Sequence, residues 1–137
     1  MTTLKVRAGP FDFLARLETA LAPRTCAYVE TLLPYTAQLV HVRWSGEGCW
    51  VPLGDQALDL PAENATSYPA IGQALFYPGG FSETEILIAY GPVRFASKLG
   101  QLAGNHFLTI TEGLDQLPAL GRLTLWEGAQ SLSLARA

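Results

Sequence analysis

The sequence contains few charged residues, few cysteines and no long apolar run. Charged residues make up 15% of the 137 residues and hydrophobic residues 49%, which excludes intrinsic disorder because disorder requires low hydrophobicity and high charge. Nine basic residues against twelve acidic ones give a net charge of −3. A protein that binds nucleic acid or an anionic membrane normally has a basic excess. The composition therefore predicts a compact, soluble domain with neither nucleic acid nor membrane as a partner.

No segment has the length of a transmembrane helix or the pattern of a signal peptide. The longest apolar stretch, 86–93, is far shorter than the roughly 20 residues of a membrane span, and residues 1–7 alternate between polar and apolar. Cys26 and Cys49 stand alone in unlike contexts, which is typical of reduced, buried thiols in a cytoplasmic protein. Metal-ligand spacing and a phosphate-binding glycine loop are both missing, so we expect no metal or cofactor.

Short strands separated by glycine and proline are the main pattern along the chain. Alternation of polar and apolar residues favours a strand over 11–18, although a helix over 11–21 is an alternative. The turn 45–48 joins two strands into a hairpin. The predicted strands cover 4–9, 11–18, 38–44, 49–53, 73–77, 83–90, 106–111, 123–126 and 132–135.

Three segments have helical signals. Pro23 suits the first turn of a helix over 23–33, apolar spacing favours a short helix over 94–102, and a helical turn is expected between Asp115 and Gly121. About eight short strands with so few helices are typical of a barrel or sandwich. We therefore predict a single mainly β domain over residues 1–137, a closed barrel with one or two short flanking helices.

Several short motifs occur in the order in which cyclophilins carry them. Residues 22–25 (Ala-Pro-Arg-Thr) resemble the start of the first cyclophilin helix, and 102–106 (Leu-Ala-Gly-Asn-His) and 112–115 (Glu-Gly-Leu-Asp) resemble two later cyclophilin segments. Three further segments are similar to an uncharacterised bacterial domain family of unknown function with a cyclophilin-like β-barrel. They are 78–85 (Pro-Gly-Gly-Phe-Ser-Glu-Thr-Glu), 103–107 (Ala-Gly-Asn-His-Phe) and 125–130 (Leu-Trp-Glu-Gly-Ala-Gln).

The departures from cyclophilins concern the catalytic motif. Cyclophilin isomerases use a Phe-His-Arg motif after the first helix, whereas this chain has His-Val-Arg-Trp at 41–44, with Arg43 as an approximate counterpart. The Gln-Phe-Phe stretch that lines the cyclophilin proline pocket has no equivalent. The resemblance thus implies the barrel, and the departures predict absent or very weak prolyl isomerase activity.

Ionisable side chains in these segments are candidates for a binding site. His106 offers a donor, an acceptor or a proton near neutral pH, although a strand histidine bonded to a backbone carbonyl is the structural alternative. Glu83 and Glu85 project from one face of a strand, where like charge raises one pKa; the alternative is a solvated face. Arg43 and Arg94 suit a carboxylate or amide ligand, or ordinary ion pairs.

Aromatic residues complete the candidate site. Trp50 and Tyr77, together with Trp44, Phe81 and Tyr90, lie in segments that a barrel brings together, and they line either a pocket or the core. We expect Arg43, His106 and at least one of the two glutamates to meet at one concave surface. The full set of candidate ligand-binding residues is Arg43, Trp50, Tyr77, Glu83, Glu85, Arg94 and His106.

The leading functional hypothesis is a protein that binds a small polar molecule or a peptide in a surface pocket, with catalysis left open. The alternatives are a divergent peptidyl-prolyl isomerase and a non-catalytic, self-associating structural protein. The sequence favours no particular reaction or ligand.

We predict a homodimer or larger homo-oligomer. A small domain with few charges and a positive mean hydropathy has more apolar surface than its own core can bury. Sedimentation velocity at micromolar concentration checks this, and a monomer at that concentration contradicts it.

Overall fold

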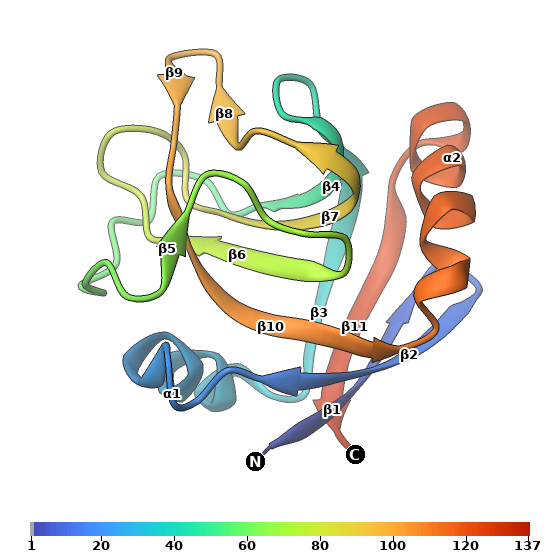
Figure 1. The fold of residues 1–137 in the computed structure, drawn as a ribbon, viewed down its shortest axis with the longest axis horizontal. Coiled ribbons are helices and arrows are strands. Elements are labelled where there is room, and N and C mark those ends of the chain that lie inside the picture. The colour runs from blue at the N-terminus through green and yellow to red at the C-terminus, as the bar shows by residue number, and fades with distance from the viewer. Residues whose placement is uncertain (1) are drawn as a thin grey trace.

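Eight antiparallel strands close into a barrel in the computed structural model, which describes residues 2–137 (Figure 1). The barrel strands are β1 (Thr3–Ala8), β2 (Phe11–Leu17), β3 (Tyr35–His41), β4 (Gly46–Pro52), β6 (Gln73–Tyr77), β7 (Glu85–Val93), β10 (Gly104–Glu112) and β11 (Gln130–Arg136). Their order is β2-β1-β11-β3-β4-β7-β6-β10, and β10 pairs with β2 to close the barrel. The predicted mainly β barrel is confirmed.

Two helices cover opposite sides of the barrel (Figure 1). Helix α1 (Pro23–Leu32) has Pro23 in its first turn, as predicted, and buries Cys26 and Val29. Helix α2 (Leu117–Glu127) follows the short 3-10 helix η1 (Leu114–Gln116) and buries Leu117 and Leu120. Each helix packs these side chains on the same barrel core.

None of the helices in residues 2–137 is long and apolar enough to cross a membrane.

Strands β6 and β7 bury both of their faces. One face, with Phe76 and Ile86, points into the barrel and belongs to the main core. Because side chains alternate along a strand, the other face, with Leu75 and Leu87, points outward. It is covered by a second, smaller core that includes Phe95 and Leu102. This outer core keeps the outward side chains of β6 and β7, such as Leu75 and Leu87, away from solvent.

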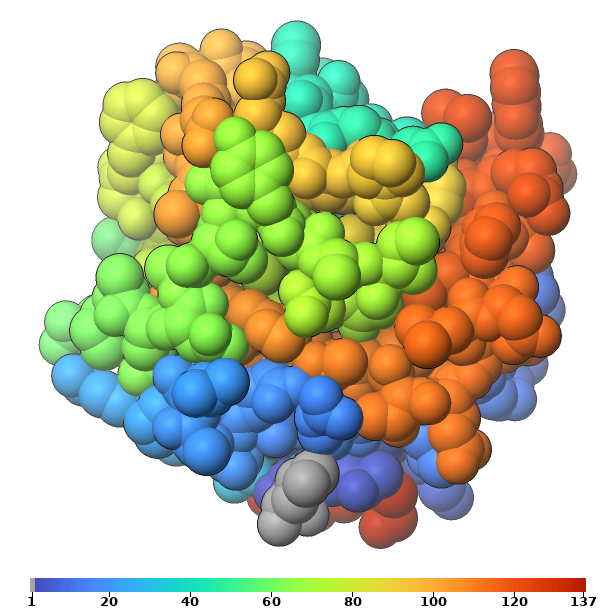
Figure 2. Space-filling model, in the orientation of Figure 1, coloured from blue at the N-terminus to red at the C-terminus, as the bar shows by residue number. Residues whose placement is uncertain are grey.

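The outer core is covered by the irregular segment 54–72 and by a small hairpin. In Figure 2 the segment 54–72 (green) lies between α1 (blue) and the hairpin formed by β8 (Ala96–Ser97) and β9 (Gly100–Gln101). The short strand β5 (Ala65–Thr66) of this segment pairs with β10. The Ser67 hydroxyl donates to the backbone oxygen of Leu102 (2.8 Å), which fixes the segment to the hairpin.

The structure corrects two local predictions. Residues 94–102 form the β8–β9 hairpin instead of a helix: Phe95 and Leu102, whose spacing suggested one helical face, meet across the hairpin through a backbone bond of 2.9 Å. Residues 123–126 continue α2 instead of forming a strand. Thr124 bonds the Gly121 oxygen within the helix, and the helix ends at Gly128, whose φ of 92° favours glycine.

Phe76 is the aromatic centre of the main core, so its truncation should destabilise the fold. It is fully buried and makes edge contacts with Tyr28 and Phe107 at centroid distances of 5.9 and 5.7 Å. We expect Phe76→Ala to lower the free energy of unfolding by about 3–5 kcal/mol in urea denaturation. The matched control is Phe81→Ala, which removes a ring that is 65% exposed and should change stability by about 0.5 kcal/mol or less. Equal effects of the two variants would contradict this description of the core.

Candidate functional site

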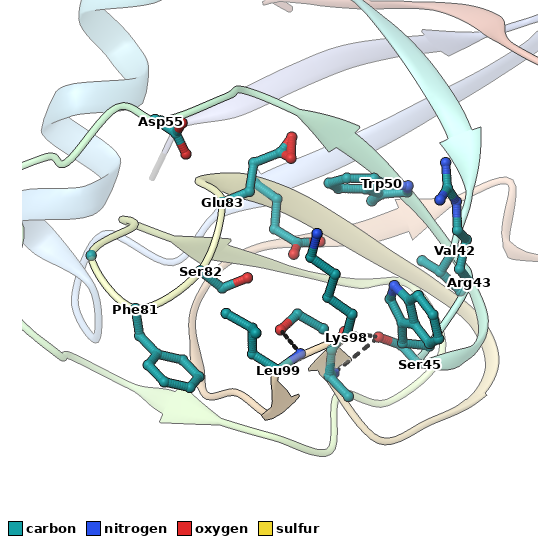
Figure 3. A pocket seen from close by; sticks show the side chains of 15 residues that line it. Val42, Arg43, Ser45, Trp50, Asp55, Phe81, Ser82, Glu83, Lys98 and Leu99 are labelled. Atoms are coloured by element: carbon teal, nitrogen blue, oxygen red, sulfur yellow. Dashed lines mark hydrogen bonds between the residues drawn. The ribbon is translucent and has the colours of Figure 1, made fainter.

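A pocket of about 390 Å³ opens on the outer wall of the barrel, beside the β8–β9 hairpin (Figure 3). Its floor is the outward face of β4 and β7, with Trp50 and Glu85. Its rim comes from the segment after β3, the loop before β7 and the turn of the hairpin. The lining side chains include Val42, Arg43, Trp44, Ser45, Trp50, Asp55, Phe81, Ser82, Glu83, Glu85, Ser97, Lys98 and Leu99.

The rim on the β3 side is held by one buried serine. The Ser45 hydroxyl donates to the backbone oxygen of Ala96 (3.0 Å) and accepts from the Ala96 backbone N–H (3.0 Å). Both bonds join the segment after β3 to the hairpin strand β8. Since Arg43 and Trp44 precede this serine and Lys98 follows Ala96, the two bonds fix the spacing between these parts of the rim.

The rim on the β7 side is held by Thr84, which is buried between two glutamates. Its hydroxyl donates to the backbone oxygen of Gln56, and its backbone bonds Leu53 and Gly54 at 2.9 and 3.0 Å. Gly79 has a φ of 88°, and a Cβ there would lie 2.8 Å from the Gln56 oxygen. The segment 78–85 is therefore a tightly held turn, and Glu83 and Glu85 flank its anchor.

Charges of both signs line the pocket without pairing. Across residues 2–137, no ion pair involves Arg43, Lys98, Asp55, Glu83 or Glu85. In Figure 3 the Lys98 side chain extends from the hairpin turn toward the space between Glu83 and Trp50. Charged side chains that find no partner in the protein are available to a charged ligand.

Glu85 is the ionisable group that the pocket perturbs most. It is 6% exposed and lies on the floor of the pocket. Burial, with a further contribution from the charge of Glu83, raises the pKa of Glu85 to about 8. The carboxyl group is therefore mostly protonated at neutral pH, so it is able to donate a hydrogen bond or give up a proton there.

The structure brings four of the seven predicted residues, Arg43, Trp50, Glu83 and Glu85, to this pocket and leaves three outside its lining. Tyr77 lies behind the pocket: its hydroxyl accepts a 3.1 Å bond from the Ser82 backbone, so it positions the loop. Arg94 is exposed beside the rim. The third, His106, belongs to a different cluster.

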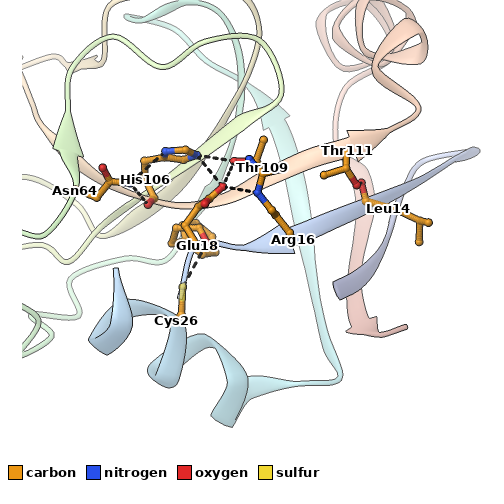
Figure 4. Close-up of polar contacts among 9 residues, drawn as sticks. Leu14, Arg16, Glu18, Cys26, Asn64, His106, Thr109 and Thr111 are labelled. Carbon is orange, nitrogen blue, oxygen red and sulfur yellow. Dashed lines mark hydrogen bonds and ion pairs between the residues drawn. The ribbon is translucent and has the colours of Figure 1, made fainter. Parts of the chain in front are cut away.

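His106 lies in a polar network between β10, β2 and the segment 54–72 (Figure 4). Thr109 donates its hydroxyl proton to Glu18 (2.5 Å), so it accepts from Nε2 of His106 (2.8 Å). Nδ1 then accepts from the Asn64 amide (3.3 Å). Burial lowers the pKa of His106, although Glu18 opposes this. The histidine is thus a neutral group with both ring nitrogens bonded.

The neighbouring Asn105 holds the segment 103–107 to two other parts of the fold. Its buried amide donates to the Thr25 hydroxyl (3.0 Å) and to the Pro61 backbone (2.9 Å), and its oxygen accepts from the Glu63 backbone (3.1 Å). The Glu63 carboxylate in turn accepts from the Thr25 backbone at the start of α1 (2.7 Å). This network joins β10, α1 and the irregular segment.

Sequence reasoning missed Asp55 and Lys98 as members of the pocket. Asp55 lies in a segment without periodicity. Lys98 lies in a segment whose apolar spacing predicts a helix but which forms a hairpin. The glycine at position 100 was the one local sequence signal for a turn there, and in the structure its φ is 123°. Within residues 2–137, no three His, Cys, Asp or Glu side chains form a group that could hold a metal ion.

The fold and the pocket define the structural class of this protein: a closed, eight-stranded antiparallel β-barrel with a charged, aromatic-lined pocket on its outer wall. The family described as "Protein of unknown function (DUF3830)" matches residues 3–136. The chain belongs to that family.

Among the solved structures that match the chain, two illustrate the shared fold. The structure of McbB in complex with tryptophan has a TM-score of 0.75 at 17% identity, over 97% of this chain and 44% of McbB. The chain therefore spans less than half the length of McbB. The solution structure of the hypothetical protein AF2241 from Archaeoglobus fulgidus has a TM-score of 0.62 at 15% identity, over 99% of this chain and 95% of AF2241. No curated protein sequence matches the chain.

The raised pKa of Glu85 predicts that Glu85→Gln removes a pH-dependent loss of stability. Well below pH 4 the carboxyl group is neutral in the folded and unfolded states alike. As the pH rises from about 4.3 toward 8, the unfolded chain ionises while the folded chain keeps its proton, so the wild type loses stability relative to the variant. We expect the advantage of Glu85→Gln, measured by urea denaturation, to grow by on the order of 3 kcal/mol between about pH 5 and pH 8.5.

The matched control for that measurement is Glu127→Gln, at an exposed position on α2. Its difference from the wild type should stay flat over the same pH range. A flat difference for Glu85→Gln would show that Glu85 ionises normally in the folded protein.

Proposed function

We propose that this protein binds a small amphipathic polar molecule, or a short stretch of peptide, in the pocket on the outer wall of its barrel. The observation that carries the proposal is a pocket in which aromatic rings and unpaired charges of both signs face one space. Its volume of about 390 Å³ lies within the roughly 300–1,000 Å³ range of small-molecule sites.

The character of the lining supports a ligand with an apolar part and polar ends. Trp44 is 55% and Phe81 65% exposed, and exposed rings at a pocket rim gain favourable contacts when a ligand covers them. Arg43 comes from the segment after β3, Lys98 from the turn of the hairpin, and Glu83 and Glu85 from the loop before β7 and the start of β7. A ligand that carries both an apolar group and a charge would use both features.

McbB offers an analogy for the size of the ligand. Its structure was determined with tryptophan, a molecule that combines an aromatic ring with charged groups. At 17% identity over less than half of McbB, the likeness supports only the idea that a protein of this fold accommodates such a molecule.

The arrangement of the motifs supports a cyclophilin-like origin for the barrel. Residues 22–25 begin α1, 102–106 lead into β10, and 112–115 lead into η1, which is the order that the resemblance implied. We do not extend the resemblance to prolyl isomerase activity, because Arg43 lies exposed at the rim and the aromatic proline pocket has no equivalent.

A thermal-shift screen with small amphipathic molecules tests the proposal. A ligand that binds only the folded state stabilises it by about 2.7 kcal/mol at a concentration of 100 Kd. We expect the compounds that raise the Tm of the wild type to lose most of their effect on Trp44→Ala and Phe81→Ala. Trp126→Ala is the matched control, since this tryptophan is 77% exposed and lies outside the pocket. A screen without any stabilising compound, or shifts that persist in both pocket variants, would contradict the proposal.

A further inference from the structure

Glu85 is an exception among the side chains of this protein. Of the acidic and basic side chains in residues 2–137, it alone is buried. The other buried polar side chains all have hydrogen-bond partners within the protein: Thr25 and Asn105 bond each other, Ser45 bonds Ala96, Thr84 bonds Gln56 and Thr124 bonds Gly121. Across the same residues, the Glu85 carboxyl group has no side-chain hydrogen bond and no ion pair.

The carboxyl group of Glu85 reaches the pocket. No side-chain oxygen or nitrogen in the described chain is fully enclosed without a partner, and Glu85 lines the pocket floor. Its orientation follows from the strand, because side chains alternate and Glu85 shares the outward face of β7 with Leu87. Leu87 pairs with Trp50 of β4. The carboxyl oxygens of Glu85 therefore face the water of the pocket, and a ligand that fills the pocket has to take the place of that water as hydrogen-bond partner.

The charges around Glu85 indicate which kind of ligand group would suit this part of the pocket. Glu83 lies two residues away, on the rim of the pocket, and Asp55 adds a third carboxylate. Tyr77 pairs with Glu85 on the neighbouring strand, and its hydroxyl accepts a hydrogen bond from the Ser82 backbone N–H. Arg43 and Lys98 line the pocket but form no ion pair with any of these carboxylates. Lys98 extends toward the space between Glu83 and Trp50 (Figure 3) yet pairs with neither glutamate, so both carboxyl groups remain free for a ligand cation with several N–H donors.

We propose that the Glu83–Glu85 pair binds the ammonium group of a primary amine, whose apolar part packs against Trp50 and the rim aromatics. Free amino acids with apolar side chains belong to this class, because Arg43 also lines the pocket and can pair with the ligand carboxylate. This inference rests on the proposed function, since it names the chemistry of the ligand in the same pocket.

Binding of the ammonium group should release a proton. The free protein holds a proton on Glu85 at neutral pH, because burial raises the pKa of this group to about 8. An ammonium ion beside the pair favours the ionised form. Affinity should therefore rise with pH through the neutral range, and the glutamine variant should lose this dependence.

The experiment compares four probes of similar shape by calorimetry: phenethylamine, phenylalanine, 2-phenylethanol and 3-phenylpropanoate. We expect the two amines to bind about tenfold or more tightly than the alcohol and the acid. Measurement in two buffers of different ionisation enthalpy should reveal proton release with the amines. Glu85→Gln and Glu83→Gln should each weaken amine binding about tenfold or more, and Glu85→Gln should also abolish the proton release. Glu127→Gln is the matched control and should bind like the wild type.

The results separate this inference from the proposed function. If the alcohol or the acid binds as tightly as the amines, or if Glu85→Gln binds phenethylamine like the wild type, the ammonium site is wrong while the pocket proposal stands. If neither amine binds at millimolar concentration, the ammonium site is wrong as well. The pocket proposal fails only if the wider screen also finds no ligand that depends on Trp44 and Phe81.

Discussion

The alternation of side chains along β7 is the constraint on which the site depends. Ile86 and Ile88 point into the barrel, so Glu85 and Leu87 must point outward. In an ordinary barrel that outward face is solvated, and a glutamate there has no unusual property. Here Phe95, Leu102 and the β8–β9 hairpin cover it. Glu85 is buried on this outward face, next to residues of the second core, and its carboxyl group reaches the pocket.

Burial without a partner is costly for a carboxylate, and the protein meets that cost by keeping the group neutral. A buried Glu–Arg pair would be the usual structural solution, and Arg43 lines the same pocket. The Ser45 bonds to Ala96 hold the rim that carries Arg43 to the hairpin, and no ion pair forms across the opening within residues 2–137. The pocket thus remains an open space between opposite charges instead of closing into a salt bridge.

Much of the barrel was predictable from local pattern. Strands such as 11–17 and 73–77 alternate clearly, and Pro23 marks the start of α1. The hairpin at 94–102 was not predictable in this way, because Phe95 and Leu102 fit a helical spacing as well as a turn. The predicted strand over 123–126 was wrong for a related reason. These residues alternate as in a strand, yet the tertiary contacts of α2 override the strand propensity.

The residue types of the candidate site were predictable from the sequence, but which of them meet in space was predictable only in part. The spacing of Glu83 and Glu85 predicted one shared strand face, but β7 begins at Glu85 and Glu83 lies in the loop before it. Both still line the pocket with Trp50, which pairs with Leu87 of β7. His106 looked equivalent from sequence, since it too lies at the start of a strand. Its partners Asn64 and Glu18 are 42 and 88 positions away along the chain, a distance that no local pattern spans. Its bonding to them was therefore invisible until the barrel had been assembled.

Carbon-13 NMR of the glutamate carboxyl groups, with Glu85 assigned through Glu85→Gln, tests the central claim most directly. In the free protein the Glu85 resonance should titrate near pH 8, and saturation with phenethylamine should move its midpoint well below neutrality, because the ammonium group stabilises the carboxylate. A midpoint near the ordinary value of about 4.3 in the free protein, or a midpoint that the amine leaves unchanged, would contradict the account.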